Sequence, residues 1–238
     1  MTSPPADPRS QRRQAVSDLK RQMILDAAER IFQQEGLDGA HMRAIATEAG
    51  YTVSALYKYY ASKEEIYADL LAASLDRLHA AVEGLPPTDA APVIRLRRRA
   101  RGFFDFYLGR PRELDLGFYL FRGLQPLGLN PELDARLNQR LADSLTGMQA
   151  DLQALGLPEA DALRETTALF AHATGVLLLV HTGRIRMFGQ QGPALFEAYL
   201  DSLVARIDAP PPHPRKNTNP DEENENNIMT IAINPPGQ

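Results

Sequence analysis

Apolar residues recur at three- and four-residue steps along most of the chain, which is the period of helices that bury one side. The first such stretch begins near residue 18 and contains Ile24, Ala28, Ile31 and Phe32. Similar stretches predict helices at 42–49, 53–59, 62–83, 93–108, 112–122, 131–155, 159–184 and 193–207. No alternation of apolar and polar residues is long enough to predict a sheet. The pattern therefore predicts an all-α protein.

Glycines and capping residues predict where the short N-terminal helices end and begin. Gly36 and Gly50 stand where the first two helices should stop, and Thr52 precedes the third. Ser62 and Glu65 have the S-x-x-E spacing of a capping box at the start of the fourth helix. These signals place several helices within the first 83 residues, as in a small helical domain.

Changes in composition predict four segments. Residues 1–17 are rich in Pro, Ser and Arg without apolar periodicity, so we expect a mobile basic arm. A small domain is expected over 18–65 and a larger helical domain over 66–207, with the break GLPPTDAAP at 84–92 falling inside the latter. Residues 208–238 are rich in Pro, Asn and charges, which predicts a disordered tail.

Charge and hydropathy narrow the classes of protein. The net charge of −4 excludes a uniformly basic protein but leaves room for a local basic surface. The absence of Cys excludes disulfides and thiolate metal sites. The longest apolar run, 168–180, is shorter than the about 20 residues that span a bilayer. We therefore expect it to be a buried helix, and we expect a cytoplasmic protein with no membrane partner and no signal peptide.

The stretch GYTVSALYKYYASKEEIY at 50–67 has the chemistry of a DNA reader. Two short helices joined by a tight glycine turn form a helix-turn-helix, whose second helix presents its N-terminal half to the major groove. Val53, Ser54 and Ala55 are small enough to let this helix approach base edges. Leu56 is expected to face the core.

Polar side chains around this helix suit contacts with phosphates. Thr52 can cap the helix and donate to a phosphate, and the hydroxyls of Tyr57 and Tyr59 can reach phosphate oxygens. Lys58 suits a phosphate or a guanine edge, and Lys63 lies at the start of the fourth helix, where backbone N–H groups also attract anions. The alternative is that the lysines are ordinary solvated charges and that Tyr57, like Tyr60, is a packing residue.

The same residues carry a resemblance to a known family over about 20–71. The shared positions are the A-x-x-x-F-x-x-x-G pattern of Ala28, Phe32 and Gly36, the I-A-x-x-A-G run at 45–50, Leu56–Tyr57, and Y-x-S-K-E-E at 60–65. In these motifs the chain resembles the N-terminal DNA-binding domain of the TetR family of bacterial transcription regulators. His41 departs from the family, which usually has a Ser or Thr cap before the second helix.

The resemblance implies a three-helix DNA-binding domain followed by a larger helical domain that binds a ligand and dimerises. It implies a homodimer that binds a palindromic double-stranded DNA operator, most often as a repressor, and that a small-molecule effector releases. Dimerisation would use the helices at 159–184 and 193–207. The DNA-binding residues implied by matching positions are Arg43, Thr52, Val53, Ser54, Ala55, Tyr57, Lys58, Tyr59 and Lys63.

The larger domain offers candidate ligand-binding residues among its aromatic side chains. These candidates are Phe103, Tyr107, Phe118, Tyr119, Phe121 and His172. The alternative is that the aromatic residues form the core and that His172 and His181 are core histidines, because ligand cavities and cores are both mainly apolar.

Two groups of arginines have open interpretations. Arg9, Arg12 and Arg13 either solubilise the terminus or reach a minor groove or phosphates as a flexible arm does. The run RLRRRAR at 95–101 is either a solvated helix face or the binding site of an acidic ligand.

Enzymes and scaffolds are the rival classes. The sequence has no G-x-S-x-G elbow, no phosphate-cradling glycine loop and no recognisable metal spacing, so we expect no catalytic residues, no metal and no cofactor. It also has no repeat of fixed period, which disfavours a scaffold of helical pairs.

Overall fold

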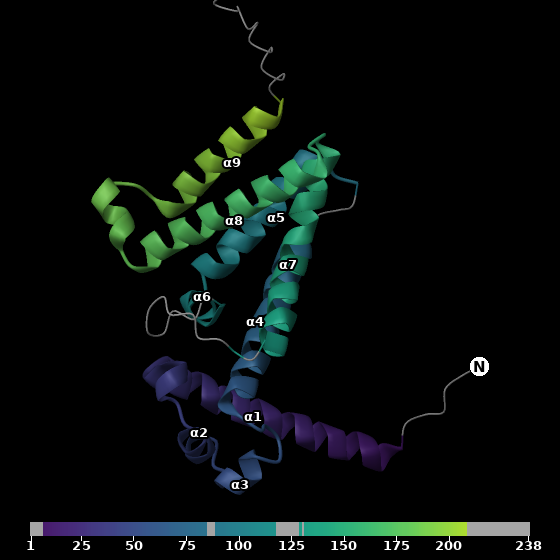
Figure 1. Cartoon of the computed structure of the whole chain (residues 1–238), viewed down its shortest axis with the longest axis vertical. Coiled ribbons are helices and arrows are strands. Elements are labelled where there is room, and N and C mark those ends of the chain that lie inside the picture. The colour runs from purple at the N-terminus through teal and green to yellow at the C-terminus, as the bar shows by residue number, and fades with distance from the viewer. Residues whose placement is uncertain (1–6, 85–88, 118–128, 130, 209–238) are drawn as a thin grey trace, which may run out of the picture.

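The computed structural model describes residues 7–84, 89–117, 129 and 131–208, and the regular structure within these ranges is helical. The all-α prediction is therefore confirmed. The elements in order are α1 (Pro8–Gly39), α2 (Met42–Glu48), α3 (Val53–Leu56), α4 (Lys63–Glu83), α5 (Pro92–Leu108), α6 (Pro111–Gly117), α7 (Pro131–Ala154), α8 (Glu159–His181), the 3-10 helix η2 (Arg184–Phe188) and α9 (Gly192–Asp208). In Figure 1, α1–α3 form one end of the molecule, α5–α9 form the other, and α4 runs between them.

The first helix begins earlier than the sequence analysis expects. Residues 8–17 are helical, whereas their composition predicts an arm without regular structure. Asp7 caps this helix by accepting a hydrogen bond from the N–H of Arg9 at 3.1 Å, and Pro8 occupies the first helical position. At the other end Gly36 has a φ of 70° and stops the regular helix, as expected. The tail expected over 208–238 lies outside the described residues beyond Asp208.

Apolar side chains from all four N-terminal helices form the core of the small domain. The residues of this core include Ile24, Ala28, Phe32, Ile45, Leu56, Ile66 and Tyr67, all of them buried. The ring of Phe32 meets the ring of Tyr67 edge-on, with centroids 5.4 Å apart. Each such buried side chain stabilises the fold by roughly 1.5–3 kcal/mol. Through Leu56, α3 therefore shares the core of the small domain, and it packs against α2.

The larger domain packs α5, α7 and α8 against one another, and α5 and α7 also pack against α4. Its core includes Leu96, Phe104 and Leu177, and the ring of Phe104 stacks on that of Phe196 from α9 at 4.3 Å. The apolar run 168–180 was expected to be a buried helix, and it lies in α8 with one side buried, including Leu169 and Leu177, whereas Ala171 and Gly175 are exposed. By length and hydropathy α8 would also suit a membrane span, the one such helix in the described ranges.

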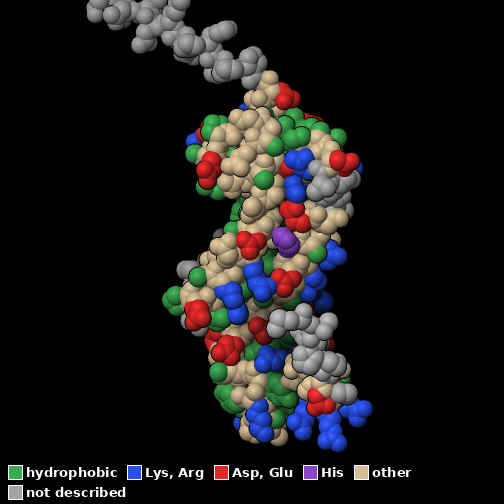
Figure 2. Space-filling view, turned by 90° about the vertical axis from the view of Figure 1, so that its right-hand side faces the viewer, with side chains coloured by type: hydrophobic (Ala, Val, Ile, Leu, Met, Phe, Trp, Pro, Cys, Tyr) green, Lys and Arg blue, Asp and Glu red, His purple; other side chains and the backbone are tan. Residues whose placement is uncertain are grey.

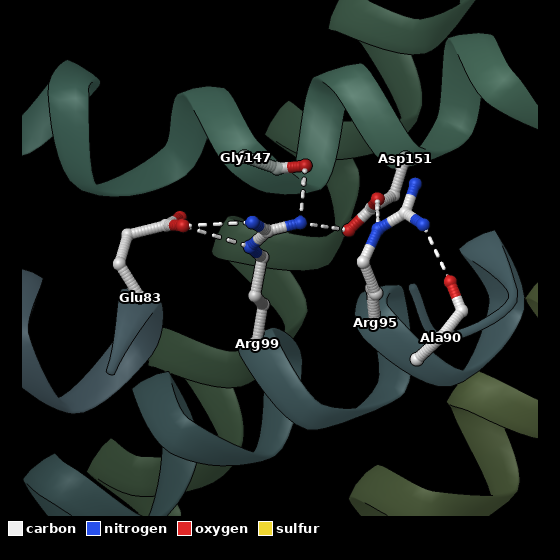
Figure 3. Close-up of polar contacts among 6 residues, drawn as sticks. All are labelled: Glu83, Ala90, Arg95, Arg99, Gly147 and Asp151. Carbon is white, nitrogen blue, oxygen red and sulfur yellow. Dashed lines mark hydrogen bonds and ion pairs between the residues drawn. The ribbon is translucent and has the colours of Figure 1, made fainter. Parts of the chain in front are cut away.

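Four arginines of the run 95–101 pair with carboxylates from other helices. The pairs are Arg95 with Asp151, Arg97 with Asp201, Arg99 with Glu83 and Asp151, and Arg101 with Glu197. Asp151 is almost completely buried and lies between two guanidinium groups, as Figure 3 shows. These ion pairs join α5 to α4, α7 and α9. The four paired arginines are therefore neither a simple solvated helix face nor a binding site open to an acidic ligand.

The helix α7 approaches this cluster through a glycine. The carbonyl oxygen of Gly147 accepts a hydrogen bond from Arg99 at 3.3 Å (Figure 3). A Cβ atom at position 147 would lie 2.1 Å from Oε1 of Glu83 and 2.6 Å from Nε of Arg99. Glycine at this position therefore permits the close approach of α7 to the ion pairs.

Candidate nucleic-acid interface

The turn between α2 and α3 is built from backbone conformation and a cap. Gly50 adopts a φ of 73°, a left-handed conformation that glycine tolerates without strain. The N–H of Tyr51 then donates to the carbonyl of Ala46 at 2.8 Å. Oγ1 of Thr52 accepts from the N–H of Ala55 at 3.2 Å, which caps α3 as predicted. The two helices therefore form the predicted helix-turn-helix.

The helix α3 buries one residue completely, leaves Val53 and Ala55 half-buried and presents Ser54 outward. Leu56 is fully buried and anchors the helix to the core. Ser54 and Lys58 are exposed, and Tyr57 is 54% exposed. We define the recognition surface as the exposed or half-buried residues Arg43, Thr52, Val53, Ser54, Ala55, Tyr57, Lys58 and Tyr59. It contains eight of the nine candidate DNA-binding residues.

Tyr60, which the sequence favours as a packing residue, is buried at the base of this surface. Its hydroxyl donates to Oδ2 of Asp69 at 3.1 Å, and the guanidinium of Arg21 lies over its ring at 5.3 Å. Burial, assisted by the Asp69 carboxylate, raises the pKa of Tyr60 to about 12. Tyr60 therefore joins α1 to α4 as a neutral side chain.

The ninth candidate, Lys63, has a structural contact that the sequence analysis did not foresee. Its Nζ donates to the carbonyl oxygen of Ala40 at 3.1 Å, which ties the start of α4 to the end of α1. The two residues are 23 positions apart, so no local pattern signals the bond. Beside Lys63, Oγ of Ser62 caps α4 by accepting from the N–H of Glu65 at 3.2 Å, as predicted.

The space-filling view supports a basic end of the molecule. Figure 2 shows Lys and Arg side chains gathered at the lower end, where Figure 1 places α1, α2 and α3. His41 precedes α2 without a side-chain capping bond and is exposed, so its imidazole is available to solvent. An exposed helix with small residues at its start and cations around it suits the major groove of DNA.

A second feature is a cavity in the larger domain with a volume of about 1080 Å³. It is lined by residues of α6, α8, η2 and α9 and their connections: Pro111, Leu114, Asp115, His172, Gly175, Val176, Leu178, Leu179, His181, Thr182, Arg184 and Leu195. Most of these side chains are apolar, which is typical of small-molecule sites.

The candidate ligand-binding residues are distributed unevenly around this cavity. His172 lines it, whereas Phe103 and Tyr107 are buried in the core next to it. The backbone oxygen of Tyr107 lies 3.0 Å from Nε2 of His181, which does line the cavity. Phe118, Tyr119 and Phe121 lie outside the described residues. Asp115 and Arg184 were not anticipated, because nothing in the sequence distinguishes them from surface charges.

The polar groups of the cavity have perturbed environments. The imidazole of His172 stacks on the ring of Tyr199 at 4.1 Å, and its Nε2 is buried without a hydrogen-bond partner. Burial lowers the pKa of His172 below its ordinary value and raises that of Asp115 above its own. The described residues contain no group of His, Cys, Asp or Glu arranged to hold a metal ion.

Comparisons with known proteins agree with this geometry. Residues 24–70 match the family described as bacterial regulatory proteins, tetR family. The chain is 35% identical over 89 residues to the HTH-type transcriptional activator FasR of Mycolicibacterium smegmatis, covering 37% of this chain and 41% of FasR. It is 36% identical over 78 residues to the HTH-type transcriptional repressor KstR2 of Mycobacterium tuberculosis, covering 33% of this chain and 39% of KstR2. The matches span about two fifths of the length of these relatives.

Solved structures extend the likeness to the fold of the larger domain. The transcriptional regulator FadR from Bacillus subtilis, in complex with stearoyl-CoA, superposes with a TM-score of 0.60 at 19% sequence identity. This superposition covers 77% of the present chain and 97% of FadR. Residues 24–70, which contain the helix-turn-helix, therefore match the tetR family of bacterial regulatory proteins, and the chain as a whole shares the fold of FadR.

Proposed function

We propose that the protein is a ligand-responsive transcriptional regulator that binds a palindromic operator as a homodimer. The observation that carries the proposal is α3, whose small N-terminal residues stay exposed or half-buried while Leu56 is fully buried. Lys58 and Arg43 are exposed beside them and supply charges for phosphates. Repression is the expected mode, since the relative KstR2 is a repressor, although the relative FasR is an activator.

The homodimer is supported by the outer face of α8. Exposed residues on this face include Leu163, Thr167, Ala171 and Gly175, so it is apolar with small side chains at the positions where another helix would approach. A second copy that packs α8 and α9 against this face would place two α3 helices on one side of DNA. Two-fold related recognition helices of this kind lie about 34–36 Å apart, one turn of the duplex.

The cavity beside α6 is the proposed effector site. Its apolar lining with His172, Asp115 and Arg184 suits a largely apolar molecule with a polar end. The complex of FadR with stearoyl-CoA shows that a protein with this fold accommodates such a molecule. The arrangement favours an amphipathic effector over a small hydrophilic one.

Contacts between α6 and α4 provide a route from the cavity to the DNA-binding domain. The hydroxyl of Tyr67 on α4 donates to the carbonyl of Leu116 on α6 at 2.5 Å, inside the protein. Arg77 on α4 also pairs with Glu113 on α6 at 2.7 Å. Because an effector shifts an equilibrium only by its differential affinity for two states, one that prefers a displaced α6 would displace α4 and weaken operator binding.

The test begins with selection of bound duplexes from a random DNA pool, followed by fluorescence-anisotropy titration of the selected duplex at several salt concentrations. We expect saturable, sequence-dependent binding that weakens as salt rises. Lys58→Ala should reduce the slope of log K against log salt by about 1. The matched control is Arg98→Ala, an exposed charge on α5 that should leave the slope unchanged.

Two results would contradict the proposal. The first is failure of the random pool to yield any enriched sequence. The second is an identical salt slope for the wild-type protein and Lys58→Ala on the selected duplex, which would remove Lys58 from the interface.

A further inference from the structure

The helix α1 is longer than the small domain requires. Its first fully buried residue is Ile24, so roughly the first 16 residues of the helix project from the core. At about 1.5 Å per residue this projection is about 24 Å long. Figure 1 shows the N-terminal part of α1 extending away from α2 and α3. We call residues 8–23 the α1 extension.

Four of the five basic residues of the α1 extension lie on one face, and the fifth, Arg21, faces Asp69 and Tyr60. Arg12, Arg13 and Lys20 lie three, four and eleven positions beyond Arg9, spacings that bring helical side chains to the same side. The three arginines are exposed, and within the described residues no carboxylate forms an ion pair with them. Their charges are therefore available to a partner, unlike those of Arg95, Arg97, Arg99 and Arg101 on α5.

The opposite face has a different character. Asp18 is five residues beyond Arg13, which places it on the far side of the helix, and it accepts a hydrogen bond from Gln14 at 2.8 Å. Residues 7–65 contain nine Lys or Arg and nine Asp or Glu, so this part of the chain is neutral in total. The basic face therefore results from the placement of charges on the helix and not from an excess of cations.

The basic face is oriented toward the side on which α3 lies. Met23 is three residues beyond Lys20 and continues the same face, and its sulfur lies 3.9 Å from the hydroxyl of Tyr51. Tyr51 belongs to the turn that directly precedes α3. The helix face that begins with Arg9 thus meets the helix-turn-helix at its turn, next to the first residue of the recognition surface, Thr52. Anionic DNA bound to that surface is the partner that the charges of this face fit.

We propose that the α1 extension binds phosphates of the same DNA duplex outside the base pairs that α3 contacts. This inference rests on the proposed function and adds a sequence-independent contact to it. The distance along the helix from Arg9 to Lys20 is about 17 Å, which corresponds to about five base pairs at about 3.4 Å each. Each half-site then requires flanking DNA of any sequence for full affinity.

The experiment compares two duplexes, one with only the selected operator and one extended by unrelated sequence on both sides. We expect the wild-type protein to bind the extended duplex more tightly, and we expect scrambling the flanks to have no effect. The variant Arg9→Gln/Arg12→Gln/Arg13→Gln should bind both duplexes equally. Its salt slope on the extended duplex should fall by about 0.9 for each lost phosphate contact.

Two matched variants control for charge and folding. Arg98→Gln/Arg110→Gln/Arg186→Gln removes three exposed charges from the larger domain and should keep the advantage of the extended duplex. Arg9→Lys/Arg12→Lys/Arg13→Lys retains the charges and should also keep it. Gln and Lys have helix propensities close to that of Arg, so circular dichroism should show unchanged helix content.

Several outcomes would overturn the inference. If the wild-type protein binds both duplexes equally, or the glutamine variant keeps the preference for the extended one, the extension does not contact flanking phosphates. If the affinity depends on the flanking sequence, the α1 extension contacts bases and not only phosphates. If the glutamine variant sediments in a different oligomeric state, the face binds a second copy of the chain. In each of these cases specific binding of the short operator would still support the proposed function, whereas its absence would remove that function.

Discussion

The buried carboxylate of Asp151 offers the sharpest test of how the larger domain is held together. It is 1% exposed and accepts from Nε of Arg95 at 2.7 Å, and its other oxygen pairs with Arg99 (Figure 3). The change Asp151→Asn keeps the shape of the side chain and removes its charge. Arg95 and Arg99, one turn apart on the same side of α5, then lie side by side without the anion between them.

The structure sets the size of the expected loss. Breaking a buried ion pair by removing one partner costs about 3–5 kcal/mol, because the remaining charge stays buried and uncompensated. Arg99 keeps Glu83 at 2.8 Å, and Arg95 keeps the carbonyl of Ala90 at 2.5 Å. We therefore expect the lower end, about 3 kcal/mol of unfolding free energy. For a chain of this size such a loss lowers Tm by about 6–12 °C.

Urea unfolding followed by circular dichroism at fixed protein concentration measures this loss. The matched control is Asp201→Asn, because Asp201 pairs with Arg97 at 2.7 Å but its side chain is 69% exposed. The control should lose less than about 1 kcal/mol, as exposed ion pairs do. Equal losses of unfolding free energy in the two variants, or no loss in Asp151→Asn, would refute the argument that burial makes the ion pairs of Asp151 strongly stabilising.

Two further predictions concern α4 and the cavity. Tyr67→Phe leaves the buried carbonyl of Leu116 without its donor and should cost about 1–3 kcal/mol in urea unfolding; an unchanged midpoint would show that the bond is dispensable. Burial lowers the pKa of His172 in the folded state, so the unfolded chain binds more protons as pH falls through about 6.5, and stability should fall with it. His172→Phe should reduce the loss of stability between pH 7.5 and pH 5, and an equally steep decline in the variant would contradict this assignment.

Local signals predicted the helix-turn-helix because its determinants are neighbours in sequence. Gly50 sets the turn, Thr52 caps α3 through the N–H of Ala55, and Ser62 caps α4, all within about a dozen residues. The early start of α1 had a local signal too, since an Asp followed by Pro is a helix-start pair, but the lack of apolar periodicity in 8–17 outweighed it.

The interactions of the larger domain had no such local signal. The carboxylates that pair with Arg95 and Arg101 lie 56 and 96 positions away, so the fold alone brings them together. The cavity likewise collects Asp115 and Arg184 from separate elements. Sequence patterns identified which residues were charged or aromatic but not which of them would face one another.

The helix α4 belongs to the cores of both domains, because Ile66 is buried near its start and Val82 near its end. Its 21 residues make it about 31 Å long. A rotation of one degree about the end near Val82 would carry the other end by about 0.5 Å over this length. A change of a few degrees beside the cavity is thus amplified into a displacement of an ångström or more at α3, the scale on which hydrogen bonds to bases are made or lost.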